Sequence, residues 1–177
     1  MTERPDDPAL PGMPHRTVRL AQSTPRWAAL FAEEATRLRA ALGSLGRDVQ
    51  HYGSTSVPGL SAKPILDILV GTSEPLMAPP FIAALAPLGY DYAPHAGVPE
   101  HLVFGKGAAR THLVHVVVYE GPAWHHALRF RDRLRADPVL AAEYDLLKQR
   151  LAAAYPIDRA RYTAEKSAFI HRVLDLP

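Results

Sequence analysis

The chain has 177 residues, of which 47% are hydrophobic and 21% are charged, and this composition excludes an intrinsically disordered protein. It contains no cysteine, which excludes disulfide frameworks, thiolate zinc sites and cysteine nucleophiles and suits a cytoplasmic location. A formal net charge of +2 is too small for a dedicated binder of duplex nucleic acid, and no apolar run approaches the ~20 residues of a membrane span.

Prolines are concentrated at the start of the chain, at Pro5, Pro8, Pro11 and Pro14. Because proline interrupts helices and central strands, residues 1–15 are predicted to form an irregular, mobile arm. The remaining residues, 16–177, have the length of a single domain.

Strands and helices can be expected along this domain from the spacing of its apolar residues. Thr24 can cap a helix that Pro25 opens and that ends before Gly43. Short apolar runs predict strands, and longer periodic stretches predict helices. The strands are expected at 48–52, 64–70, 101–104 and 111–119, and the further helices at 74–88, 122–136, 138–154 and 159–174. This order predicts an α+β fold with a mixed central β-sheet, packed helices and a C-terminal helical bundle.

Asp67 is the most informative single residue, because it lies within an apolar run that predicts a strand covered on both faces. A carboxylate in such a place must be paired, hydrogen-bonded, protonated or bound to a metal. The functional interpretation is a ligand or metal site. The structural one is a carboxylate satisfied by the backbone or by an arginine.

The loop before this strand has the composition of a phosphate-binding turn. Its residues Gly53, Ser54, Thr55 and Ser56 offer backbone N–H groups and hydroxyls, which can surround an anion. Lys63 lies just before the strand and could neutralise a phosphate. A plain turn and a surface lysine are the alternatives.

Three cations of the C-terminal helices border the apolar faces instead of opposing them: Lys166, Lys148 and Arg131. A half-buried cation needs an anionic partner. That partner could be a phosphate, Asp67, or a helix acid such as Glu143 or Glu165. Long side chains can also reach water.

Two histidines occur in the strand predicted at 111–119. His112 and His115 are three residues apart and therefore point to opposite faces, so they are not a ready metal-binding pair. One of them could face Asp67, and His115 is taken as the candidate. Such a contact would serve acid–base catalysis or form a satisfied buried pair.

Two neighbouring stretches, HYGSTSVPGL at 51–60 and AKPILDI at 62–68, resemble the signature of the GrpB family, also called UPF0157. The stretches at 110–116 and 162–170 agree with it, and the resemblance covers about residues 17–175. The family is similar to nucleotidyltransferases of the polymerase-beta type. This resemblance implies a Gly-Ser turn that holds a triphosphate and carboxylates that hold two magnesium ions.

The chain departs from that pattern at the metal site. The superfamily uses Asp-x-Asp, but here Asp67 is followed by Leu69 on the same strand face, and the strand at 111–119 has no acid. Two-metal transfer needs several carboxylates, so a complete two-metal centre is not expected. One magnesium ion could still bind through Asp67 and substrate phosphates.

The sequence therefore predicts binding of a nucleotide or another phosphate-bearing small molecule, with magnesium-dependent nucleotidyl transfer as the catalytic extension. Asp67 and His115 are the catalytic candidates, and Asp67 is also the metal ligand. The alternative is a non-catalytic interaction or assembly module in which the polar residues are structural.

Overall fold

The computed structural model describes residues 9–10, 12–14, 16–96 and 99–176. The strands of this part are β1 (Asp48–Tyr52), β2 (Leu66–Thr72), β3 (Tyr90–Tyr92), β4 (Leu102–Lys106) and β5 (His112–Val118). Its α-helices are α1 (Arg26–Leu42), α2 (Ala78–Leu85), α3 (Pro122–Ala136), α4 (Pro138–Ala154), α5 (Arg159–Ala164) and α6 (Ser167–Leu174). Three short 3-10 helices join them: η1 (Gly43–Leu45), η2 (Ser54–Ser56) and η3 (Ala86–Leu88).

The strands form one mixed sheet in the order β1-β2-β5-β4-β3. β2 and β5 run parallel, and the other neighbouring strands pair antiparallel. Asp67 on β2 lies opposite Tyr52 of β1 and beside Leu113 of β5. Side chains alternate between the faces of a strand, so the neighbours Leu66 and Ile68 point away from the Asp67 face.

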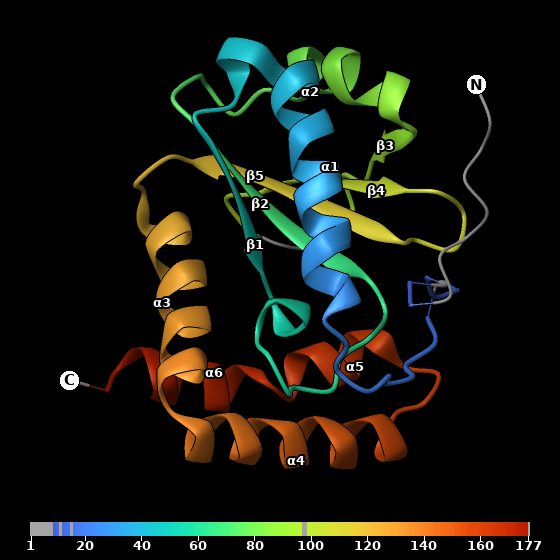
Figure 1. The fold of residues 1–177 in the computed structure, drawn as a ribbon, viewed down its shortest axis with the longest axis vertical. Coiled ribbons are helices and arrows are strands. Elements are labelled where there is room, and N and C mark those ends of the chain that lie inside the picture. The colour runs from blue at the N-terminus through green and yellow to red at the C-terminus, as the bar shows by residue number, and fades with distance from the viewer. Residues whose placement is uncertain (1–8, 11, 15, 97–98, 177) are drawn as a thin grey trace.

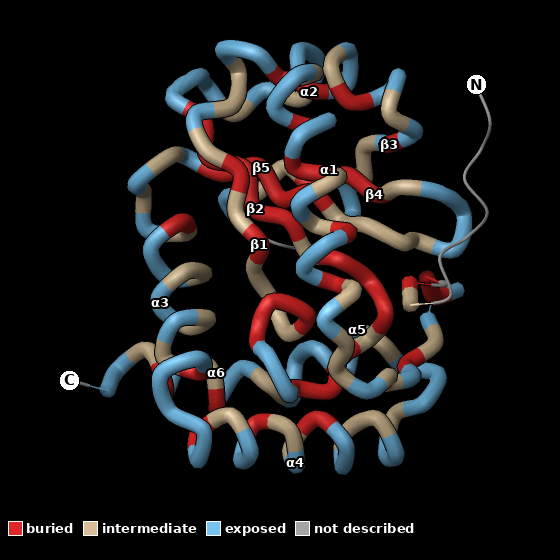
Figure 2. The backbone as a smooth tube through the Cα atoms, in the orientation of Figure 1, coloured by how far each residue is buried: buried red, intermediate tan, exposed pale blue. Residues whose placement is uncertain are grey.

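The face that carries Leu66 and Ile68 packs against α1 and α2. The largest hydrophobic cluster forms here and includes Trp27 and Leu38 of α1 with Phe81 of α2. These three side chains and those of Leu66 and Ile68 are almost fully buried. Complete burial of a large apolar side chain contributes about 1.5–3 kcal/mol. This face therefore anchors the sheet, and Figure 1 shows α1 lying across it, with the central strands buried in Figure 2.

The opposite face, which carries Asp67, is covered by α3 near the middle of the strands. Leu69 and Val117 pack there against Trp124 of α3. A separate hydrophobic cluster joins the C-terminal helices to the segment that follows η2. Its buried members are Val57, Leu60, Leu134, Leu140, Tyr144, Phe169 and Val173. Figure 1 shows these helices below the sheet, with the η2 turn between the two layers.

The α+β class, the mixed sheet and the C-terminal helical part predicted from the sequence are confirmed. The three-residue strand β3 was not predicted, because it is too short for a periodic pattern. The helix expected at 74–88 is shorter and begins at Ala78, since prolines 79 and 80 fit only a first helical turn. The helix expected at 159–174 is interrupted between α5 and α6, at Lys166.

The predicted N-terminal arm lies partly outside the described residues, which omit 1–8, 11 and 15. The described part packs against the domain. Leu10 and Met13 are 3% and 2% exposed, and the carbonyl of Ala9 accepts a hydrogen bond from the indole of Trp27 at 2.8 Å. Apolar side chains among the prolines thus hold this segment in place. No described helix combines the length and the apolar character needed to cross a membrane.

Replacement of Glu34 by glutamine tests the buried polar contact between α1 and the sheet. The Glu34 carboxylate is almost fully buried and accepts hydrogen bonds from Tyr90, Lys106 and Arg37 at 2.9, 2.7 and 3.0 Å. Loss of its charge leaves the Lys106 ammonium without a counter-charge, so Glu34→Gln should lower the free energy of unfolding by about 3 kcal/mol in urea titrations. Glu165→Gln breaks an exposed pair and should cost under about 1 kcal/mol. Equal effects would contradict the assignment.

Candidate functional site

Asp67 lies at the end of β2 that faces the C-terminal helices, pressed against the turn that follows β1. A Cβ atom added to Gly53 would lie 2.7 Å from the Asp67 Oδ2 atom, and Gly53 has a φ of +69°. Both the close approach and the left-handed backbone require glycine here. The Gly-Ser turn and the strand carboxylate are therefore in direct contact, as their order in the sequence suggested.

The Asp67 carboxylate has no direct partner within the described part of the chain, where it makes neither a hydrogen bond nor an ion pair. Burial raises its pKa, while Lys63, Arg159 and Lys166 act in the opposite direction through their charges. The residue is nevertheless partly exposed. The carboxylate is thus held near three cations without being neutralised by contact with any one of them.

We call Lys63, Arg159 and Lys166 the cation group. They come from the segment before β2, the first turn of α5 and the junction of α5 and α6. The Nζ atoms of Lys63 and Lys166 lie 5.7 and 4.4 Å from the ring centroid of Tyr162. All three members are partly buried. The group brings three basic side chains around one carboxylate, Asp67.

Burial and repulsion within this group depress the pKa values of both lysines. The pKa of Lys63 falls to about 7, first through burial and then through Arg159 and Lys166. The pKa of Lys166 falls to about 8, where burial and Arg159 outweigh the attraction of Asp67. An additional negative charge among these side chains would relieve both effects.

The four residues of the predicted phosphate loop have different roles. Ser54 interacts with the phenol of Tyr144, whose pKa is raised mainly by burial and also by Asp67. The Thr55 hydroxyl lies 2.9 Å from Nε2 of His51, and the Ser56 hydroxyl donates to the Gly53 carbonyl at 2.6 Å. Gly53 and Ser54 therefore lie toward Asp67, while the hydroxyls of Thr55 and Ser56 stabilise the loop.

Lys148 is fully committed to contacts within the protein. It is 1% exposed, its ammonium donates to the carbonyl of Ser61, and it lies 3.4 Å from the carboxylate of Asp145. That carboxylate also accepts from the backbone N–H and hydroxyl of Ser61 at 2.9 and 2.6 Å. The apolar-face position was correctly expected, but the observed anionic partner is Asp145 and the contacts tie α4 to the loop before β2.

Arg131 also makes structural contacts. Its guanidinium donates to the Gln50 side chain and the His51 carbonyl, at 3.0 and 2.9 Å, and pairs with Asp132 at 2.7 Å. It fixes α3 to β1. A ligand-binding role for Arg131 or Lys148 stays a prediction, and neither belongs to the group around Asp67.

His112 and His115 point to opposite faces, as predicted. His115 shares the Asp67 face, but its Nδ1 lies 3.2 Å from Nδ1 of His101, and its ring meets the edge of Tyr52 at 5.4 Å. In the described structure it makes no hydrogen bond to Asp67. Burial lowers the pKa of His115 to about 3, so the ring is neutral at pH 7.

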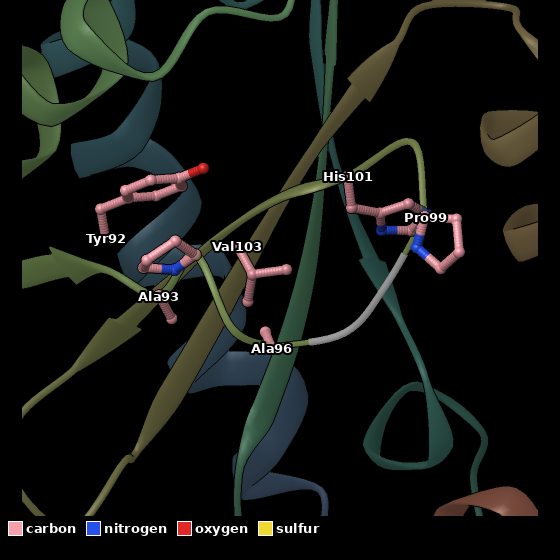
Figure 3. A pocket seen from close by; sticks show the side chains of 7 residues that line it. Tyr92, Ala93, Ala96, Pro99, His101 and Val103 are labelled. Atoms are coloured by element: carbon pink, nitrogen blue, oxygen red, sulfur yellow. The ribbon is translucent and has the colours of Figure 1, made fainter.

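A hollow of about 340 Å³ lies beside His101 (Figure 3). Its wall includes His101 and Val103, and the latter pairs with His115 across β4 and β5. The complete lining is Tyr92, Ala93, Pro94, Ala96, Pro99, His101 and Val103. Asp67 and the cation group do not line it, so this hollow is separate from the charged site.

The predicted magnesium site has few acidic ligands among the described residues. No group of three or more histidine, cysteine, aspartate or glutamate side chains among them could hold a metal ion. Asp67 is the single carboxylate at the site, with Leu69 next to it on the same face. Magnesium is normally bound through carboxylates, phosphates and water, whereas the side chains surrounding Asp67 are cationic.

Arg159 and Tyr162 were not identified from the sequence as site residues. Helical spacing alone does not place them beside Lys166, because the helix expected at 159–174 is interrupted at that residue.

Comparisons with known proteins show the family. The model of the GrpB protein family matches residues 17–176. The glutamate-rich protein GrpB of Alkalihalophilus pseudofirmus is 36% identical over 162 residues, covering 88% of this chain and 93% of the relative. The crystal structure of conserved protein GrpB from Enterococcus faecalis has a TM-score of 0.80 at 35% identity, covering 88% of this chain and 94% of that chain. A weak likeness links the chain to Cid1 with its short product ApU, at a TM-score of 0.45 and 16% identity, covering 75% of this chain and 42% of Cid1.

A pair of glycine substitutions tests the contact between Gly53 and Asp67. Gly53→Ala should destabilise the protein by about 2 kcal/mol more than Gly59→Ala in urea unfolding, because it meets a side chain in addition to backbone strain. Gly59 also has a positive φ, of +81°, but a Cβ atom there would meet nothing within 4 Å. Equal destabilisation of the two variants would disprove the close approach.

The depressed pKa of Lys63 predicts a stability that depends on pH. The unfolded chain binds a proton below about pH 10.5, whereas the folded chain binds it only below about pH 7. The lowered pKa of Lys63 therefore makes the free energy of unfolding rise between pH 7 and pH 10.5. Lys63→Met should be more stable than the parent near pH 7, by on the order of a few kcal/mol, with the difference shrinking toward pH 10.

Thermal and urea unfolding across this pH range measure that difference. Arg161→Met is the control, because it removes a largely exposed cation from the same region. It should leave the slope of stability against pH unchanged. A Lys63→Met slope identical to that of the parent would show that this ammonium is not perturbed.

Proposed function

We propose that this chain, which belongs to the GrpB family, binds a phosphate-bearing small molecule such as a nucleotide at the Asp67 end of β2. The observation that supports this most is the partly buried cation group around a carboxylate that pairs with none of its members. If all four groups are charged, the net local charge is positive. An anionic ligand supplies the missing counter-charge.

The types of side chain suit phosphate. Lysine presents a compact ammonium to phosphate oxygens, and arginine presents a planar fork that can hold two of them. Gly53 brings the backbone of the turn against Asp67, and Ser54 adds a hydroxyl on the same side. A phosphate placed among these groups would meet donors from both the sheet layer and the C-terminal helices.

Catalysis is a separate proposal. The sequence suggested Asp67 and His115 as catalytic residues, but His115 pairs with His101 and makes no hydrogen bond to Asp67 in the described structure. A single carboxylate also does not suit two-metal nucleotidyl transfer. An assay for pyrophosphate release from labelled triphosphates with candidate acceptors tests this extension.

An assembly module is the alternative, and the complete internal bonding of several predicted ligand residues favours it. The hydroxyls of Thr55 and Ser56 and the cations of Lys148 and Arg131 all have protein partners. In that case, the polar residues hold the turn, α3 and α4 together. The cation group is the part of the site that this explanation leaves without a role.

Arg159→Met should weaken binding of AMP, ATP, CoA or inorganic pyrophosphate at least about tenfold, because it removes one of three converging cations. Isothermal titration calorimetry measures the dissociation constants, and thermal shifts screen the panel. Arg161→Met is the matched control, since Arg161 is on the same helix but is 61% exposed and pairs with Glu165.

Equal weakening by both arginine variants would indicate nonspecific attraction instead of a site. Failure of every ligand in the panel to bind the parent protein would overturn the proposed function and favour the assembly module.

A further inference from the structure

We infer that the cation group holds a phosphate monoester directly, without a magnesium ion, and that it selects the dianion over a phosphate diester. This inference rests on the proposed function and specifies the chemical class of its ligand. It replaces the metal ion expected from the family resemblance with three side chains of the protein.

The donor set at Asp67 provides few ligands for a magnesium ion. A magnesium ion bound to protein and phosphate usually has one or two carboxylate ligands and keeps several waters. The position that would supply a second carboxylate on the same strand face is Leu69. Its neighbour across the sheet, His115, bonds to His101 and is turned toward that side chain. Asp67 would therefore have to hold the metal without a second acidic ligand.

The positive charge around Asp67 also disfavours a magnesium ion. Lys63, Arg159 and Lys166 already act on the Asp67 carboxylate through their fields. A divalent cation at that carboxylate would be repelled by all three. An anion would be attracted by the same three charges, and Asp67 alone would oppose it. The arrangement therefore favours phosphate oxygens over a metal ion.

The net charge of the site favours a phosphate monoester over a phosphate diester. Three protonated side chains and one carboxylate leave two positive charges. A bound dianion favours this state, because its charge raises the pKa values of Lys63 and Lys166 from about 7 and about 8. A phosphate monoester carries about −1.5 to −2 at pH 7, whereas a diester carries a single charge. The monoester therefore matches the site. Both lysines lie near one ring, that of Tyr162, with their Nζ atoms 5.7 and 4.4 Å from its centroid.

Other charged and titratable groups near the lysines do not change this balance. Tyr52, Tyr144 and Tyr162 stay neutral because burial raises each phenol pKa, and His115 is neutral because burial lowers its pKa. The nearby pair of Lys148 and Asp145 carries opposite charges.

The test compares AMP, a monoester, with 3′,5′-cyclic AMP, a diester of the same nucleoside, in calorimetric titrations with excess EDTA or excess magnesium chloride. AMP should bind with the same dissociation constant, within about twofold, in both buffers, and cyclic AMP should bind at least about tenfold more weakly. Binding of AMP only in the magnesium buffer would overturn the inference and leave the proposed function intact. Binding of neither nucleotide nor pyrophosphate in either buffer would overturn both.

Asp67→Asn adds a test in which the two models predict opposite signs. Below the pKa of Lys63, about 7, removal of the carboxylate should tighten AMP binding severalfold, because it deletes the one repulsive charge. If Asp67 held a metal ion for the ligand, the same variant would lose AMP binding in the magnesium buffer. Circular dichroism and the melting temperature confirm that the variant is folded. If the variant is not folded, the comparison of AMP binding by the parent protein in EDTA and in magnesium chloride decides between the two models.

Discussion

The electrostatic environment of Asp67 is the constraint on which the rest of the site depends. A carboxylate at the end of a central strand lies within the fields of three basic side chains and contacts none of them. Contact would have produced a closed ion network and left nothing for a ligand to neutralise. The separation keeps an excess of positive charge at a partly exposed position. The proposed attraction of the site for anions rests on that separation.

The polar residues around this carboxylate divide into a scaffold and a site. The scaffold comprises contacts that join distant elements: Thr55 with His51, Arg131 with β1, and Lys148 with Ser61. These bonds fix the turn and the C-terminal helices relative to the sheet. The site consists of Asp67, the Gly53–Ser54 corner and the cation group. Residue types that look equivalent along the chain therefore have different functions in the fold.

The sequence was sufficient for the sheet and helices whose apolar patterns are local, and for Asp67, whose polarity stands out in an apolar run. It also predicted that Lys148 and Lys166 border inward faces. It could not show which anion each cation meets. Lys148 meets the carbonyl of Ser61, 87 positions away in the chain, and no local pattern encodes that contact. Arg159 was missed because its role depends on where the break at Lys166 directs the last two helices.

The molecule has two principal apolar cores that do not merge. One lies between the sheet and α1 and α2, and the other lies among the C-terminal helices and the segment after η2. In the cation group, Lys63 comes from the segment before β2, and the other two members come from the layer of C-terminal helices. Like charges therefore face each other across the boundary between the two layers. Their repulsion acts against the bonds of Lys148 and Arg131, which hold the two layers together. In the proposed complex, an anion bound between the two layers would offset this repulsion, so ligand binding and the stability of the whole domain would be coupled.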